Sequence, residues 1–90
     1  MRETKIEAHL VRRIRRIGGR CFKVVFPGID GAPDRLVLLP GGELTWVETK
    51  STGGRLRPSQ IHMHKDLRDF LQEVLVIRSI DGVDSKFPIE

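Results

Sequence analysis

Two acidic residues stand where they could hold a divalent metal ion, and a lysine lies close to one of them in the sequence. Asp34 opens the apolar run 36–39, while Glu48 closes the apolar run 44–47 and is followed two residues later by Lys50. Both runs have the length of short β-strands. Because residues two apart in a strand project from the same face, Glu48 and Lys50 point the same way. The segment 40–42, Pro-Gly-Gly, separates the runs and predicts a β-hairpin with a short turn.

The length of this turn decides whether the two acids meet. A two-residue turn at 41–42 would place Arg35 opposite Glu48 and send Asp34 to the other face. A three-residue turn at 40–42 pairs Leu36 with Trp46 and Asp34 with Glu48, and we adopt this register. Opposed residues have Cβ atoms about 5 Å apart, and like charges at that distance are destabilising. Two opposed carboxylates therefore predict a divalent cation between them.

These residues resemble a known family. The pairing of Pro33-Asp34 with Glu48-Thr49-Lys50 is similar to the motif of the PD-(D/E)xK nuclease superfamily. Further features narrow the resemblance to the VRR-NUC domain, and they are Glu7 in an opening helix that contains Val11-Arg12-Arg13, the segment Gly31-Ala32-Pro33-Asp34, and Gln60. The resemblance extends from Glu7 to about Arg78. It implies an α/β fold with a restriction-endonuclease-like core, in which helices flank a mixed central sheet in the order α-β-β-β-α-β.

The resemblance also implies roles for individual residues. Asp34 and Glu48 would hold Mg2+ or Mn2+, with Glu7 and the Thr49 carbonyl as further ligands. Lys50 would orient or deprotonate the attacking water and offset charge on the phosphate, unless it simply pairs with an acid. Gln60 would help to position a phosphate or the water, and its alternative is an ordinary exposed residue.

Glu7 has a second explanation. Thr4 and Glu7 match a capping box, in which each side chain bonds to the other residue's backbone amide. The spacing alone favours this cap, whereas the resemblance implies a metal ligand.

The charge of the chain indicates a polyanionic partner. Sixteen Lys and Arg against twelve acids give a formal charge of +4 and a pI near 9.8, which favours nucleic acid. The basic residues that could contact DNA phosphates lie in the first helix and in the loop 51–57, and they are Arg12, Arg13, Arg15, Arg16, Arg55 and Arg57. A solvated basic face is the alternative for any one of them.

The remaining pattern predicts the elements around this hairpin. Apolar spacing predicts helices over residues 4–17 and 58–71, a strand over 20–26, and a buried strand over 74–77 that lies parallel to its neighbour. The three histidines, His9, His62 and His64, lack the spacing of a zinc site and are expected at the surface or its edge. Residues 79–90 give no chemical signal, although Val83, Phe87 and Ile89 would be unusual in a free tail.

We therefore expect one nuclease domain over residues 1–90. Its predicted activity is metal-dependent endonucleolytic cleavage of DNA by a homodimer. The preferred candidate substrate is a four-way junction, and a flap is the second candidate. A non-catalytic nucleic-acid-binding module and a structural subunit of a larger assembly are the alternatives. The chain lacks an apolar run of the roughly 20 residues that span a membrane, and its one cysteine, Cys21, fits a reducing compartment. Both features predict a cytoplasmic protein.

Overall fold

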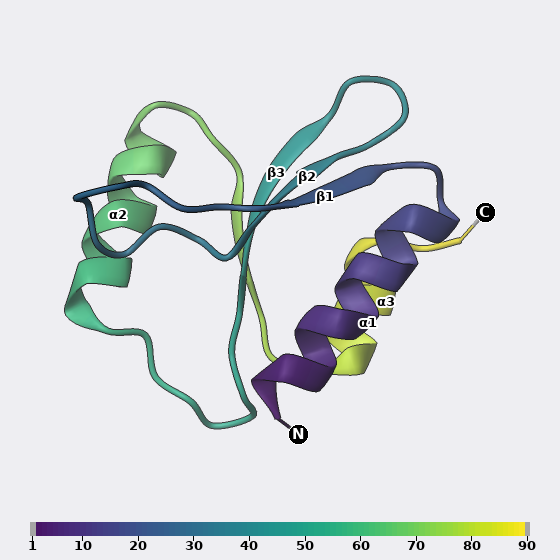
Figure 1. Ribbon diagram of the computed structural model, residues 1–90, viewed down its shortest axis with the longest axis horizontal. Helices are drawn as coiled ribbons and strands as arrows, with labels where there is room; N and C mark the ends of the chain where they lie inside the picture. The colour runs from purple at the N-terminus through teal and green to yellow at the C-terminus, as the bar shows by residue number, and fades with distance from the viewer. Residues whose placement is uncertain (1, 90) are drawn as a thin grey trace.

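A four-stranded sheet with helices on both sides forms the protein (Figure 1). The computed structural model describes residues 2–89. The elements in chain order are α1 (Glu3–Arg16), β1 (Arg20–Lys23), β2 (Arg35–Leu38), β3 (Leu44–Thr49), α2 (Pro58–Asp69), β4 (Val74–Ile77) and α3 (Ile80–Lys86). The strands lie in the order β1-β2-β3-β4. The pairs β1–β2 and β2–β3 are antiparallel, and β3–β4 is parallel. This confirms the predicted α/β class and the mixed sheet, and α3 is an additional helix that the sequence did not predict.

The β2–β3 hairpin has the three-residue turn. The Leu39 amide donates to the Glu43 carbonyl at 2.9 Å, and Leu36 lies opposite Trp46 in the ladder. The last ladder pair is Arg35 with Val47, so the register continues to Asp34 and Glu48. The predicted register is therefore correct.

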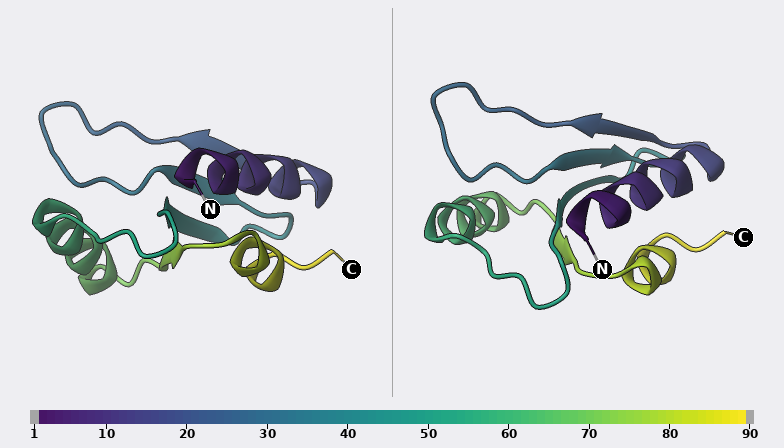
Figure 2. Two further views of the ribbon diagram at one scale, coloured as in Figure 1. Left: turned by 90° about the horizontal axis from the view of Figure 1, so that it is seen from below. Right: turned by 60° about the horizontal axis from the view of Figure 1, so that its bottom comes forward.

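The core lies between the sheet and α1, with α3 beside α1 (Figure 2). The apolar stripe of α1 is fully buried and consists of Ile6, Leu10 and Ile14. It packs with Val37 and Val47 of the sheet and with Val83 and Phe87 near the end of the chain. Ser79 begins α3 by accepting a hydrogen bond from the Gly82 amide at 2.9 Å. Val83 and Phe87 of the C-terminal segment thus have a role within the chain, whereas Ile89 is exposed.

The segment between β1 and β2 packs against α2. β1 ends at Lys23 and not at Phe26 as predicted, although the Val24 amide still donates to the Asp34 carbonyl at 2.9 Å. Gly31 in this loop has a φ of +92°, and a Cβ atom there would lie 2.2 Å from the Ser59 carbonyl oxygen. Only glycine fits this backbone and this close approach. The loop that leads into β2 therefore packs directly against the first turn of α2.

The end of α2 differs from the prediction. The helix stops at Asp69, so Phe70 and Leu71 are 80% and 93% exposed and do not contribute to an apolar side. Leu71 adopts a left-handed conformation with a φ of 63°, in a position that glycine usually occupies after a helix. Within residues 2–89, no helix combines the length and apolar character needed to cross a membrane.

Candidate active site

Three carboxylates meet where α1 begins, β2 begins and β3 ends. One carboxylate oxygen from each of Glu3, Asp34 and Glu48 lies within 4.8 Å of the others. Asp34 and Glu48 come together because the hairpin register places them opposite each other. Glu3 comes from the first turn of α1, and sequence reasoning did not select it.

Thr49 fixes the carboxylate of Asp34. The Thr49 backbone amide and its side-chain hydroxyl donate to Asp34 Oδ2 at 3.1 and 2.9 Å. Thr49 is fully buried in β3, so its position is set by the sheet. Two donors on one oxygen define the orientation of the Asp34 carboxylate.

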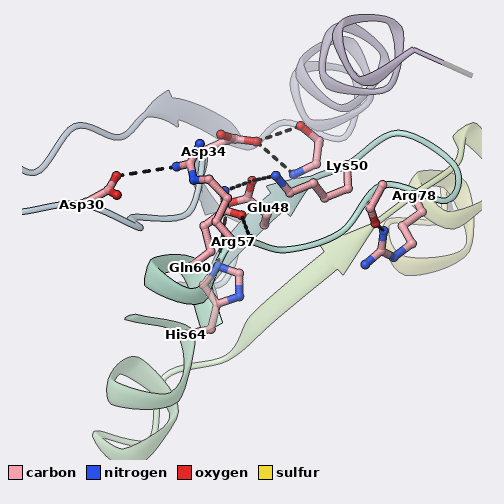
Figure 3. A network of polar contacts seen from close by, with 10 residues as sticks. Asp30, Asp34, Glu48, Lys50, Arg57, Gln60, His64 and Arg78 are labelled. Atoms are coloured by element: carbon pink, nitrogen blue, oxygen red, sulfur yellow. Dashed lines mark hydrogen bonds and ion pairs between the residues drawn. The ribbon is translucent and has the colours of Figure 1, made fainter. Parts of the chain in front are cut away.

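Glu48 is a buried acid with unusual surroundings (Figure 3). Its Oε2 atom accepts a hydrogen bond from Gln60 Nε2 at 3.1 Å, and Lys50 Nζ lies 3.8 Å from the same oxygen. Its Oε1 atom has no hydrogen-bond partner among residues 2–89. Burial, and then the nearby charge of Asp34, raise the pKa of Glu48 to about 8. A negative charge on Glu48 is therefore costly unless a cation accompanies it.

The donor set of this cluster suits a hard divalent cation. Such cations prefer oxygen ligands, and Mg2+ is commonly bound by one or two carboxylates together with waters and substrate phosphates. Glu3, Asp34 and Glu48 supply carboxylate oxygens only, and Glu48 Oε1 is buried without a partner. The residues present thus fit a Mg2+ or Mn2+ site.

Glu7, the ligand that the resemblance implied, lies outside this cluster of acids. Its Oε2 atom accepts hydrogen bonds from Arg35 Nε at 2.8 Å and Lys23 Nζ at 3.1 Å. Burial would raise the pKa of Glu7, but the hydrogen bonds from Arg35 and Lys23 outweigh it and hold the pKa below its ordinary value. The capping box with Thr4 does not form either, since α1 starts after Arg2 without a side-chain cap. Glu7 instead ties α1 to β1 and β2.

Gln60 is buried and is fully engaged by its neighbours. Its Oε1 atom accepts a hydrogen bond from the Arg57 amide at 2.8 Å, and its Nε2 atom donates to Glu48. The first turn of α2 thereby holds Glu48 in place. The Arg57 side chain lies 3.6 Å from Asp30, an exposed residue outside the acid cluster. Gln60 therefore links the first turn of α2 to Glu48.

His64 is buried beside Glu48, so the expectation that it lies at the surface is wrong. It is only 1% exposed, and its Nε2 atom is 3.7 Å from Glu48 Oε1. Burial, and then the charges of Arg68 and Lys50, lower the pKa of His64. The sequence does contain a signal for this position, because His64 follows Gln60 by four residues and so shares its face of α2. His62 is exposed as expected, and His9 contacts Asp84 at 2.7 Å.

The predicted DNA-contacting arginines fall into two groups. Arg13 packs between α1 and the C-terminal segment, where it donates to the Phe87 carbonyl at 2.8 Å and lies 3.0 Å from Asp84. The structure therefore gives Arg13 a structural role. The other five arginines are exposed along α1 and the loop before α2, and they are Arg12, Arg15, Arg16, Arg55 and Arg57.

Known proteins with a similar fold and sequence define the class. A solved structure described as a VRR_NUC domain matches with a TM-score of 0.87 and 32% identity, over 92% of this chain and 90% of that one. The chain is also 44% identical over 81 residues to "Putative nuclease p44" of Acyrthosiphon pisum secondary endosymbiont phage 1, covering 90% of this chain and 87% of that protein. No protein-family model matches the chain. The fold is thus that of a nuclease domain. The chain belongs to the VRR-NUC nuclease family.

Proposed function

We propose that the protein is a Mg2+- or Mn2+-dependent endonuclease that hydrolyses DNA phosphodiester bonds. The observation that supports this most is the cluster of Glu3, Asp34 and Glu48, whose oxygens lie within 4.8 Å of one another. The name of the related phage protein supports the nuclease class. A module that only bound DNA would gain nothing from a buried carboxylate whose ionisation is opposed by burial and by Asp34.

Glu3, Asp34 and Glu48 hold the cation in this proposal, with the Thr49 carbonyl as a further ligand. The bound cation lowers the pKa of water and neutralises charge on the phosphate. Thr49 keeps Asp34 oriented through the two hydrogen bonds to Oδ2. Gln60 does the same for Glu48. Asp34 and Glu48 therefore each have a neighbour that sets the direction of the carboxylate before substrate binds.

Lys50 supplies the remaining catalytic group. Its side chain is mostly buried, and its Nζ atom lies 3.8 Å from Glu48 Oε2. From there it orients or deprotonates the attacking water and offsets the negative charge that builds on the phosphate. At 3.8 Å the ammonium forms an ion pair with Glu48 and is too far away for a hydrogen bond to it.

A branched DNA molecule is the proposed substrate, with a four-way junction first and a flap second. The exposed arginines Arg12, Arg15 and Arg16 on α1, and Arg55 and Arg57 before α2, would contact backbone phosphates of the DNA. We propose a homodimer over a single domain of residues 1–90, because a twofold enzyme could cut two strands of a symmetric junction. The exposed apolar residues Phe70 and Leu71 are available for such an interface. The site of action would be the cytoplasm of a bacterial or phage-infected cell.

Cleavage of end-labelled DNA tests this function. The purified protein is incubated with a four-way junction, a flap and plain duplex, in buffer with Mg2+, with Mn2+, or with EDTA. We expect cutting of the junction with either metal and none with EDTA. Binding of all three DNAs without cutting in any buffer would favour the binding module instead. Light scattering over a dilution series tests the assembly, and a mass near one 10.3 kDa chain together with full activity would eliminate the dimer.

A further inference from the structure

Three buried polar atoms without partners lie together in the site. Within residues 2–89, the buried side-chain nitrogen and oxygen atoms that have no hydrogen-bond partner are Glu48 Oε1, His64 Nδ1 and His64 Nε2. Leaving such a group unpaired in the interior is unfavourable, because it has lost its hydrogen bonds to water. His64 Nε2 and Glu48 Oε1 are 3.7 Å apart, so a movement of less than about 1 Å would bring them within hydrogen-bond distance. Their placement calls for a functional explanation.

His64 and Gln60 face the two oxygens of the same carboxylate. They are four residues apart on α2, and they therefore lie one turn apart on one face of the helix. Gln60 Nε2 donates to Glu48 Oε2 at 3.1 Å, while His64 Nε2 is directed at Glu48 Oε1. Figure 3 shows both side chains reaching from α2 toward Glu48. The helix thus places one side-chain nitrogen near each oxygen.

We propose that His64 is a positioning residue for Glu48, donating a hydrogen bond from Nε2 to Glu48 Oε1 when the cation is bound. This inference rests on the metal site of the proposed function. An ionised Glu48 accepts hydrogen bonds through both oxygens, and the two donors on α2 would fix its plane as Thr49 fixes Asp34. The opposite tautomer would set the lone pair of Nε2 against a carboxylate oxygen, which is unfavourable because both atoms are acceptors. Replacing a residue that hydrogen-bonds to a metal ligand typically lowers the metal affinity by roughly 10–100-fold.

Substitutions at position 64 test the hydrogen bond through metal binding, measured by electron paramagnetic resonance of free Mn2+. His64→Leu removes the donor and is expected to weaken Mn2+ binding by roughly 10–100-fold. His64→Gln places an amide nitrogen near the position of Nε2 and should recover most of the affinity. His62→Leu changes an exposed histidine of the same helix and should leave the affinity unchanged. A folded His64→Leu protein that binds Mn2+ as tightly as the wild type would refute the role, and so would a folded His64→Gln protein no better than His64→Leu.

The tautomer of His64 gives a second test that needs no substitution. NMR of isotope-labelled imidazole nitrogens in the wild-type protein with saturating Mg2+ should show the proton of His64 on Nε2. A proton on Nδ1 alone would overturn the proposal even if the Leu variant failed to fold. Cleavage is not the readout, so a protein that binds Mn2+ but cuts no DNA would refute the proposed activity and leave the role of His64 intact. A wild-type protein that binds no Mn2+ would refute both.

Discussion

Glu3 and Glu7 lie one turn apart on α1, and their carboxylates meet different partners. Glu3 faces the acids Asp34 and Glu48. Glu7 faces two basic side chains and forms its shorter hydrogen bond, at 2.8 Å, with Arg35, the residue that follows Asp34. One helix thus contributes an acid to the candidate metal site and a second acid that anchors the helix beside it.

This difference predicts opposite effects when each glutamate is replaced by glutamine. Glu3→Gln removes one of several crowded negative charges, so metal-free stability should hold or rise while Mn2+ affinity falls. Glu7→Gln weakens the interactions with Arg35 and Lys23 and should lower stability by roughly 1–2 kcal/mol. Thermal unfolding without metal and Mn2+ titration of both variants provide the comparison. A larger decrease of Mn2+ affinity in Glu7→Gln than in Glu3→Gln would return the ligand role to Glu7.

The buried position of Glu48 predicts that metal-free stability depends on pH. Its pKa is about 8 in the folded protein and 4.5 ordinarily, so between these values the folded chain retains a proton that the unfolded chain has lost. The contribution of Glu48 to stability is therefore fully present below pH 4.5, declines as the pH rises, and is lost above pH 8. The glutamine of the Glu48→Gln variant does not ionise, so the free energy of unfolding of this variant should depend less on pH.

Denaturant unfolding of the two proteins across this pH range, with EDTA present, measures the effect. Subtracting the free energy of unfolding of the variant from that of the wild type at each pH cancels the contribution of other groups. If the free energy of unfolding changed with pH in the same way in both proteins, Glu48 would ionise in the folded protein as it does in the unfolded chain. In the wild type, Mn2+ affinity should also fall as the pH drops below about 8, because protons compete with the metal for the carboxylate.

We expect the exposed arginines to affect DNA affinity and the packed Arg13 to affect the stability of the fold. Neutralising exposed Arg55 or Arg57 should weaken binding to DNA of any sequence. It should also make the salt dependence shallower by about one unit of slope for each phosphate that the protein no longer neutralises. Arg13→Ala should lower stability, because it removes the hydrogen bond to Phe87 and the ion pair with Asp84, and should leave the slope unchanged. Fluorescence anisotropy at several salt concentrations, paired with thermal unfolding, separates the two effects. A change of slope in Arg13→Ala alone would reverse the assignment.

The hairpin and its acids could be predicted because the information is local. A glycine turn between two apolar runs restricts the possible registers, and the adopted register brings Asp34 and Glu48 together. Residues such as His64 and Glu3 depend on how α2 and α1 dock on the sheet, which local spacing does not determine. The sequence pointed to Glu7 and not to Glu3, because which of the two faces the acids depends on how α1 docks and where Arg35 lies. The helix α3 escaped prediction because Asp81-Gly82 is typical of a turn, whereas burial of Val83 and Phe87 stabilises the short helix.

Single-turnover cutting of a labelled four-way junction in Mg2+ tests whether Asp34, Glu48 and Lys50 carry out metal-dependent cleavage. The variants are Asp34→Asn, Glu48→Gln and Lys50→Ala, with His62→Leu as a surface control and circular dichroism to verify folding. Each of the three variants should remain folded and cut at least about a hundredfold more slowly than the wild type, while the control keeps the wild-type rate. A folded variant at any of these three positions that cuts the junction at a near wild-type rate would show that the replaced residue is not catalytic.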